Sequence, residues 1–100
     1  IMTYTPRQIA DYFLYIGKED PTMTPMKLIK LVYIAHGWNL GLNDEDLINE
    51  PVQAWKYGTV IASLYEDFRE FKSEKITKIP QQEPNIILDS INELEIRKIM

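Results

Sequence analysis

The chain has 100 residues, 45% of them hydrophobic and 26% charged, and its net charge is −4. These values predict one soluble domain over residues 1–100, long enough to bury a core, and its acidic balance argues against a broad phosphate-binding surface. No apolar run reaches the roughly 18 residues that span a membrane. The absence of cysteine excludes disulfides and thiolate metal sites, and it fits a cytoplasmic protein.

A capping box at Thr5–Gln8 starts the first predicted helix. Thr5 is its expected N-cap, and Pro6 suits the first helical position because its missing N–H would have no partner there. Apolar residues follow at helical spacing, at Ile9, Phe13 and Ile16. Gly17 ends this helix, and a polar connector leads to the next Thr-Pro pair.

The longest apolar-periodic stretch runs from Thr24 to Leu42, with Thr24 as N-cap and Pro25 as the first helical residue. At 100° per residue, one face carries Leu28, Leu31, Val32, Ala35, Trp38 and Leu42. The second face carries Met26, Ile29, Tyr33 and Leu40, with Gly37 beside them. A helix that is apolar on nearly all sides is normally buried by neighbours on several sides. We therefore expect a central buried helix around which the rest of the domain packs.

Two short strands are expected after this helix. Asn43–Asp46 lacks the ligand spacing of an EF-hand, so we expect a solvated turn and no metal site. Val52–Tyr57 alternates in polarity, which is typical of a strand, and Gly58 ends it. A candidate partner strand is Lys75–Pro80.

Two further helices complete the predicted fold. Thr59 is the expected cap of a third helix, whose buried face carries Ile61, Leu64, Tyr65, Phe68 and Phe71. Asn85 is the expected cap of a fourth, which carries Ile87, Leu88, Ile91 and Leu94. The fold class is therefore α+β and mainly α, with about four helices and a small two-stranded β element. The amphipathic end at Met100 has no stop signal, so we expect a domain truncated at its C-terminus.

The sequence contains few residues suited to catalysis. His36 is the single histidine, and a lone histidine between apolar faces is usually a core or rim residue with one hydrogen-bond partner. No phosphate-binding glycine loop and no nucleophile elbow is present. We therefore predict that the protein is not an enzyme and has no catalytic residue and no cofactor, although His36 as a catalytic base stays an alternative.

Two groups of residues are candidates for binding. Trp55, Lys56 and Tyr57 form an aromatic–basic cluster that can pack in the core, anchor a protein interface or stack on bases. Lys27 and Lys30 lie on a narrow polar strip of the second helix. They can pair with acidic side chains of the same domain or form part of a contact surface.

The motif from Thr24 to Leu40, joined to Glu50–Val60 and Leu64-Tyr65, resembles the Panacea domain family of SocA-like antitoxins and prophage-associated proteins. The likeness covers roughly residues 5–71. It rests on a lysine-leucine helix with Gly37-Trp38 and on the Ala54–Gly58 segment, Ala-Trp-Lys-Tyr-Gly. The family's usual proline after this glycine is replaced by Thr59, and family members usually continue through further C-terminal helical segments.

The resemblance implies a cytoplasmic antitoxin, from a bacterium or prophage, that neutralises a cognate toxin by direct binding. Delivery to a protease is a variant of this role, and self-association is a further possibility. We expect the partner surface to use the polar and amphipathic residues of the motif: Lys27, Lys30, Trp55, Lys56, Tyr57 and Tyr65. Tyr33, Gly37, Trp38 and Gly58 are expected to be structural, and Gly37 to admit a neighbouring element, such as the Trp55 segment, close to the helix. The alternative function is a small nucleic-acid-binding regulator, which the acidic balance disfavours.

Overall fold

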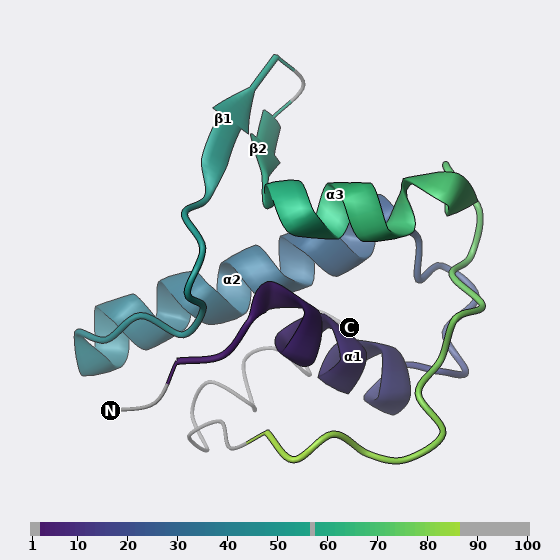
Figure 1. Cartoon of the computed structure of the whole chain (residues 1–100), viewed down its shortest axis with the longest axis horizontal. Helices are drawn as coiled ribbons and strands as arrows, with labels where there is room; N and C mark the ends of the chain where they lie inside the picture. Colours follow the sequence, from purple (N-terminus) through teal and green to yellow (C-terminus); the bar gives the residue numbers. More distant parts are fainter. Residues whose placement is uncertain (1–2, 57, 87–100) are drawn as a thin grey trace.

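The computed structural model describes residues 3–56 and 58–86 (Figure 1). Its elements, in chain order, are α1 (Pro6–Ile16), α2 (Pro25–Asn43), β1 (Gln53–Trp55), β2 (Gly58–Val60), α3 (Ala62–Phe68) and a 3-10 turn, η1 (Arg69–Phe71). This arrangement confirms an α+β fold that is mainly helical. The predicted fourth helix falls almost wholly outside the described residues, which include three α-helices.

The first helix forms where the sequence predicts it. The amide N of Gln8 donates to Thr5 Oγ1 at 3.2 Å, and the amide N of Thr5 donates to Gln8 Oε1 at 2.8 Å, which completes the capping box. At the other end, Gly17 is the C-cap, and its amide donates to the carbonyl of Phe13. The buried side of α1 carries Ile9, Ala10, Phe13 and Leu14.

The second helix begins as predicted but is buried on one side only. Its inner face, Leu28, Leu31, Val32 and Ala35, is fully buried. Both α1 and α3 pack on this helix and on each other, and Figure 1 draws both in front of α2. On the other side Met26, Tyr33 and Leu40 are 78%, 43% and 40% exposed. The expectation of a helix buried on several sides is therefore wrong, because the described helices that pack on α2 cover only its inner face.

A β-hairpin projects from this helical layer (Figure 1). Strand β1 pairs with β2 in antiparallel register, with Gln53 opposite Val60 and Trp55 opposite Gly58. The prediction that Lys75–Pro80 is the partner strand is wrong, because β1 pairs with β2 instead. Ile76 is instead fully buried, and its amide donates to the carbonyl of Met23 at 2.8 Å.

The third helix joins the hairpin to the core. Thr59 lies within β2, so the prediction that Thr59 caps α3 is also wrong, and the N-cap is Ile61, which has no side-chain hydrogen bond to offer. Ile61, Leu64 and Phe68 are fully buried. Arg7 of α1 reaches Asp67 at 3.3 Å and lies 4.8 Å from the ring centroid of Phe68, which ties α1 to α3. No helix within residues 3–56 and 58–86 has the length and apolarity that crossing a membrane requires.

Candidate functional site

The base of the hairpin is closed by a carboxylate. Glu50 Oε2 accepts a hydrogen bond from the amide N of Ser63 at 3.0 Å. The first amides of a helix have no partner within the helix, and α3 receives no cap from Ile61. Glu50 therefore acts as a remote cap, and its negative charge suits the positive end of the helix. Because Glu50 and Ser63 flank the whole hairpin, this bond fixes where the hairpin leaves the domain.

Sequence reasoning missed the role of Glu50. In the sequence, Glu50 stands out only as the first residue of the family-like segment Glu50–Val60. The sequence offered no local signal, because the expected cap Thr59 would have supplied an acceptor of its own, and the need for a remote one follows only from the start of α3 after Ile61. Pairing that need with the particular carboxylate requires the path of the hairpin, which local periodicity does not supply.

An exposed aromatic pair lies on the hairpin and α3. The rings of Trp55 and Tyr65 meet edge to face, with centroids 5.3 Å apart and an interplanar angle of 67°. The side chains are 42% and 41% exposed, so the interpretation of Trp55 as a core residue is wrong. Trp55 Nε1 donates to Gln53 Oε1 at 2.9 Å, which holds the indole over the hairpin. Such rings offer a large contact area at a small entropic cost, as in protein interfaces.

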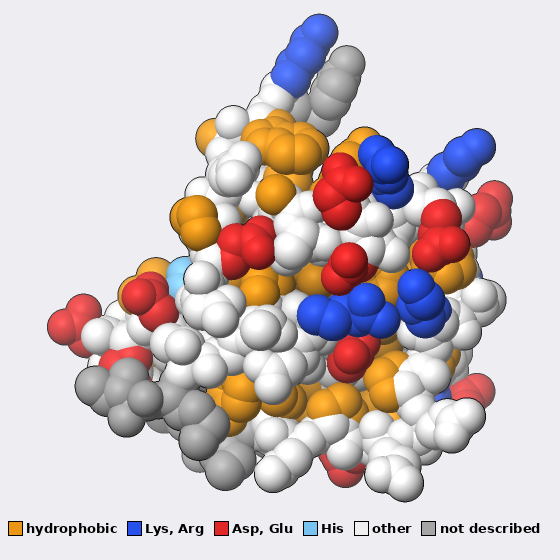
Figure 2. All heavy atoms as spheres, in the orientation of Figure 1, with side chains coloured by type: hydrophobic (Ala, Val, Ile, Leu, Met, Phe, Trp, Pro, Cys, Tyr) orange, Lys and Arg blue, Asp and Glu red, His pale blue; other side chains and the backbone are white. Residues whose placement is uncertain are grey.

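The turn of the hairpin carries a positive charge. Lys56 is exposed in the turn, and Figure 2 shows hydrophobic side chains along the projecting hairpin with a Lys or Arg side chain at its tip. Tyr57 lies outside the described residues. Gly58 has φ +123°, a backbone angle that residues with a Cβ rarely adopt, so glycine is needed where β2 begins. The exposed cluster of Trp55, Lys56 and Tyr65 is called the hairpin surface below.

The two lysines of the predicted strip have different surroundings. Lys27 Nζ forms an ion pair with Asp20 and donates to Thr22 Oγ1 at 3.0 Å, so this lysine pairs within the domain. The hydrogen bonds from Lys27 and Thr22 lower the pKa of Asp20 to about 2. Lys30 is exposed on the outer side of α2, where no described residue forms an ion pair with it. Lys27 is thus occupied by partners within the domain, whereas Trp55 and Tyr65 contact each other on the hairpin and α3.

The motif residues of α2 lie on or near its open side. Tyr33 and Trp38 are 43% and 38% exposed. A Cβ added at Gly37 would have no atom of the described residues within 4 Å. The prediction that the Trp55 segment approaches the helix at Gly37 is therefore wrong, since the hairpin leaves the domain on the α3 side.

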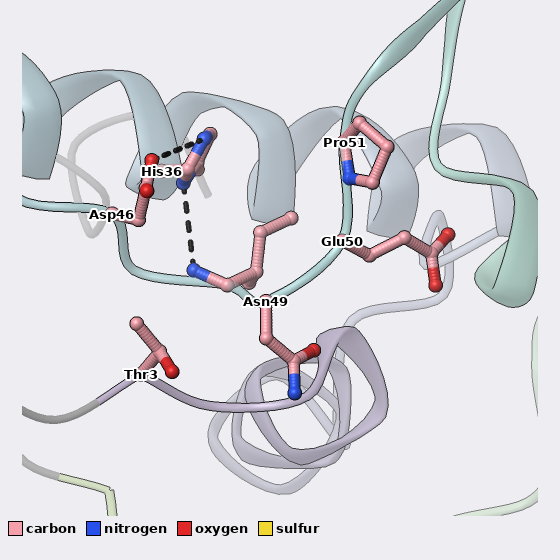
Figure 3. Close-up of a pocket in the computed structure, with 7 residues that line it drawn as sticks. Thr3, His36, Asp46, Asn49, Glu50 and Pro51 are labelled. Atoms are coloured by element: carbon pink, nitrogen blue, oxygen red, sulfur yellow. Dashed lines mark hydrogen bonds and ion pairs between the residues drawn. The ribbon is translucent and has the colours of Figure 1, made fainter.

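His36 lines a separate open depression with Thr3, Asp46, Ile48, Asn49, Glu50 and Pro51 (Figure 3). Its Nδ1 accepts a hydrogen bond from the amide N of Leu47 at 3.2 Å, while its Nε2 lies 3.9 Å from Asp46 Oδ1. Burial lowers the pKa of His36, and Asp46 opposes that shift. An Nδ1 that accepts from a backbone amide must be unprotonated, so the neutral ring carries its proton on Nε2.

This geometry confirms the prediction of a rim histidine with a hydrogen-bond partner. His36 holds the segment after α2 against the helix, and Ile48 continues that segment into a bridge with Tyr4. No cysteine or serine lines the depression. Within the part of the chain that the structure describes, no three His, Asp or Glu side chains gather as metal ligands.

A search of the curated proteins finds no match, and a search of the solved structures finds none either. A family model does match the chain over residues 28–99, and its description is antitoxin SocA-like, Panacea domain. The match begins within α2 and continues beyond the last described residue, so it starts later and extends further than the motif likeness over residues 5–71. It covers more than half of the chain, which therefore belongs to the SocA-like Panacea domain family of antitoxins.

Proposed function

We propose that this chain is the antitoxin of a bacterial or prophage toxin–antitoxin pair and that it neutralises a cytoplasmic toxin by binding it through the hairpin surface. The family supports the general role. The observation that carries the proposal for the site is the exposed edge-to-face pair of Trp55 and Tyr65 on a projecting hairpin. Aromatic side chains in such positions dominate binding energy in many protein interfaces.

The surroundings of the aromatic pair support binding rather than chemistry. The Glu50–Ser63 bond and the Gln53–Trp55 bond orient the hairpin before a partner arrives, which lowers the entropic cost of association. Lys56 adds a cation in the turn that follows Trp55, so a toxin surface that combines carboxylates with an apolar patch would be complementary. Lys27 is left out of this surface because Asp20 already neutralises it.

Co-expression with the product of the adjacent gene tests the proposal. The neighbour alone should stop growth, and the wild-type chain should restore it. Trp55→Ala should raise the dissociation constant of the purified complex by about thirtyfold or more, the loss expected of an aromatic hot spot. Trp38→Ala is the matched control, because Trp38 has a similar exposed fraction but lies on α2.

Other outcomes would contradict the proposal. If Trp55→Ala and Trp38→Ala raised the dissociation constant equally, the hairpin surface would not be the binding site that we propose. Rescue of growth without a measurable complex would remove direct binding. A toxin half-life that shortens only when a protease is present would support the adaptor variant of the same proposal, and an unchanged half-life would support occlusion.

A further inference from the structure

The open side of α2 carries a continuous stripe that the proposed function does not use. Met26, Lys30, Tyr33, Gly37 and Leu40 follow one another at alternating steps of four and three residues, so they share one face of the helix. Gly41 continues it, and all six residues are exposed. We call these six residues the outer stripe. Large apolar side chains gathered on one face of a soluble domain mark an interaction site more often than single exposed ones do.

Charge along α2 is arranged against its own dipole. A helix has a partial positive charge at its N-terminus and a partial negative charge at its C-terminus. The first turn of α2 has no acidic residue, and the last turn has no basic residue. Lys30 lies near the positive end without an ion pair among the described residues. Asp44 is the C-cap at the negative end, and Glu45 and Asp46 follow it. The N-terminal end of α2 therefore lacks a favourable negative charge, and its C-terminal end lacks a favourable positive charge. In each case the missing charge is present at the opposite end of the helix.

We propose that the outer stripe binds a second copy of the same chain, with the two α2 helices antiparallel and crossing at Gly37. A two-fold axis places equivalent residues opposite each other at the crossing, and glycine there lets the two backbones approach. Lys30 lies seven residues before Gly37 and Asp44 seven residues after it, about 10 Å along the axis in each direction. The antiparallel arrangement therefore brings Lys30 of each copy to Asp44 of the other.

The apolar residues fit the same register. Tyr33 is four residues before Gly37, and Gly41 is four residues after it, so each tyrosine ring lies over a glycine of the second copy. A Cβ added at Gly37 or at Gly41 would have no described atom within 4 Å, so both positions leave space above the helix. The antiparallel pair also opposes the two helix dipoles. A second copy is thus complementary to the outer stripe in both charge and shape.

The experiment measures mass by sedimentation from about 10 µM to about 500 µM, a range that covers weak dissociation constants. We expect the wild-type full chain to change from monomer to dimer within this range. Lys30→Glu places two like-charged pairs in the dimer and should raise its dissociation constant by at least about tenfold. Lys56→Glu on the hairpin alters net charge equally and should leave the dimer unchanged.

A mixture of two single variants tests the register. Lys30→Glu and Asp44→Lys should each be monomeric, because each brings like charges together. Mixed in equal amounts, they should form a heterodimer, because the two introduced charges then face each other with opposite signs and the unchanged Lys30 meets the unchanged Asp44. Circular dichroism checks that each variant keeps the helical content of the wild type, and Asp44→Asn offers a milder change that suits the left-handed cap.

Three results would overturn the proposal. The first is a wild-type chain that stays monomeric at the highest concentration, which would leave the stripe to residues 87–100 or to the toxin. The second is a dimer that is indifferent to Lys30→Glu. The third is a pair of folded single variants that fail to associate when mixed. None of these results affects the hairpin surface, whose test relies on Trp55 and the toxin.

Discussion

Both faces of α2 carry large apolar side chains, but the environments of these side chains are opposite. Leu28, Leu31 and Val32 on the inner face are fully buried by α1 and α3. Met26, Tyr33 and Leu40 on the outer face are at least 40% exposed. A helical pattern shows that a side chain needs cover but not which molecule provides it. The contrast therefore separates residues that fold this domain from residues that are available to another molecule.

The largest expected difference between the two faces is in the free energy of unfolding that is lost when a leucine is truncated. Leu31→Ala should lower the free energy of unfolding by about 2–5 kcal/mol, because it leaves a cavity among buried side chains. Leu40→Ala should change it by less than about 0.5 kcal/mol, as is usual for exposed positions. Urea unfolding of both variants at low micromolar concentration makes the comparison. Equal losses would show that the outer face is covered within the single chain.

The lysines offer a second comparison between the two sides. Lys27→Met breaks the ion pair with Asp20 and the bond to Thr22, and we expect a loss of about 1–2 kcal/mol in unfolding free energy. Lys30→Met should have almost no effect on the monomer, because no described partner loses a contact. A thermal melt of each dilute variant measures the difference. Similar melting temperatures would mean that the Lys27 pair adds nothing.

Acid titration gives a further prediction for the same pair. The pKa of Asp20 is lowered to about 2, below its usual value near 3.9, so the folded state prefers the carboxylate. Its stabilising contribution is complete above about pH 4 and is lost as the pH falls toward 2. Lys27→Met should weaken this pH dependence, which urea unfolding at a series of acidic pH values can measure. An unchanged slope would assign the pKa shift to Thr22 alone.

His36 lies at the border between the two faces of α2. It should give a smaller pH dependence of stability, at a pH nearer neutrality. Burial lowers its pKa, so the unfolded chain takes up a proton first as the pH falls below about 6.5. Stability should therefore decrease from pH 7 to pH 5, and the protonated ring can no longer accept from Leu47. His36→Leu should cost about 1 kcal/mol at pH 7 and remove this part of the pH dependence. A variant that keeps the wild-type slope would point to another group.

Local chemistry in the sequence predicted the starts of α1 and α2 well. The hydroxyl oxygens of Thr5 and Thr24 accept hydrogen bonds from amides only three positions further along the chain. Thr59 failed as a cap because the strand pairing of β2 prevailed over its local preference. The partner of β1 was misplaced because the hydrophobic pattern of Lys75–Pro80 does not show that Ile76 enters the core. Non-local contacts decided both points.

Non-local contacts also explain which residues of the candidate surface could be predicted from the sequence. The family motif drew attention to Trp55, Lys56 and Tyr65, and the structure shows all three exposed on the hairpin and α3. Lys27 has the same charge and lies on the same strip as Lys30. Only the path of the Asp20–Thr22 turn shows that Lys27 is neutralised within the domain.

The smallest expected effect comes from Gly37 and has the opposite sign. Glycine inside a helix destabilises it by roughly 0.5–1 kcal/mol relative to alanine, and no described atom opposes a Cβ here. Gly37→Ala should therefore raise the unfolding free energy of the dilute chain by about this amount. At high concentration it should weaken self-association, because the added methyl groups separate the helices at their crossing. A chain that carries a destabilising glycine on an open face gains from it only when something approaches that face, so a stabler monomer together with a weaker dimer would show what the outer face of α2 is for.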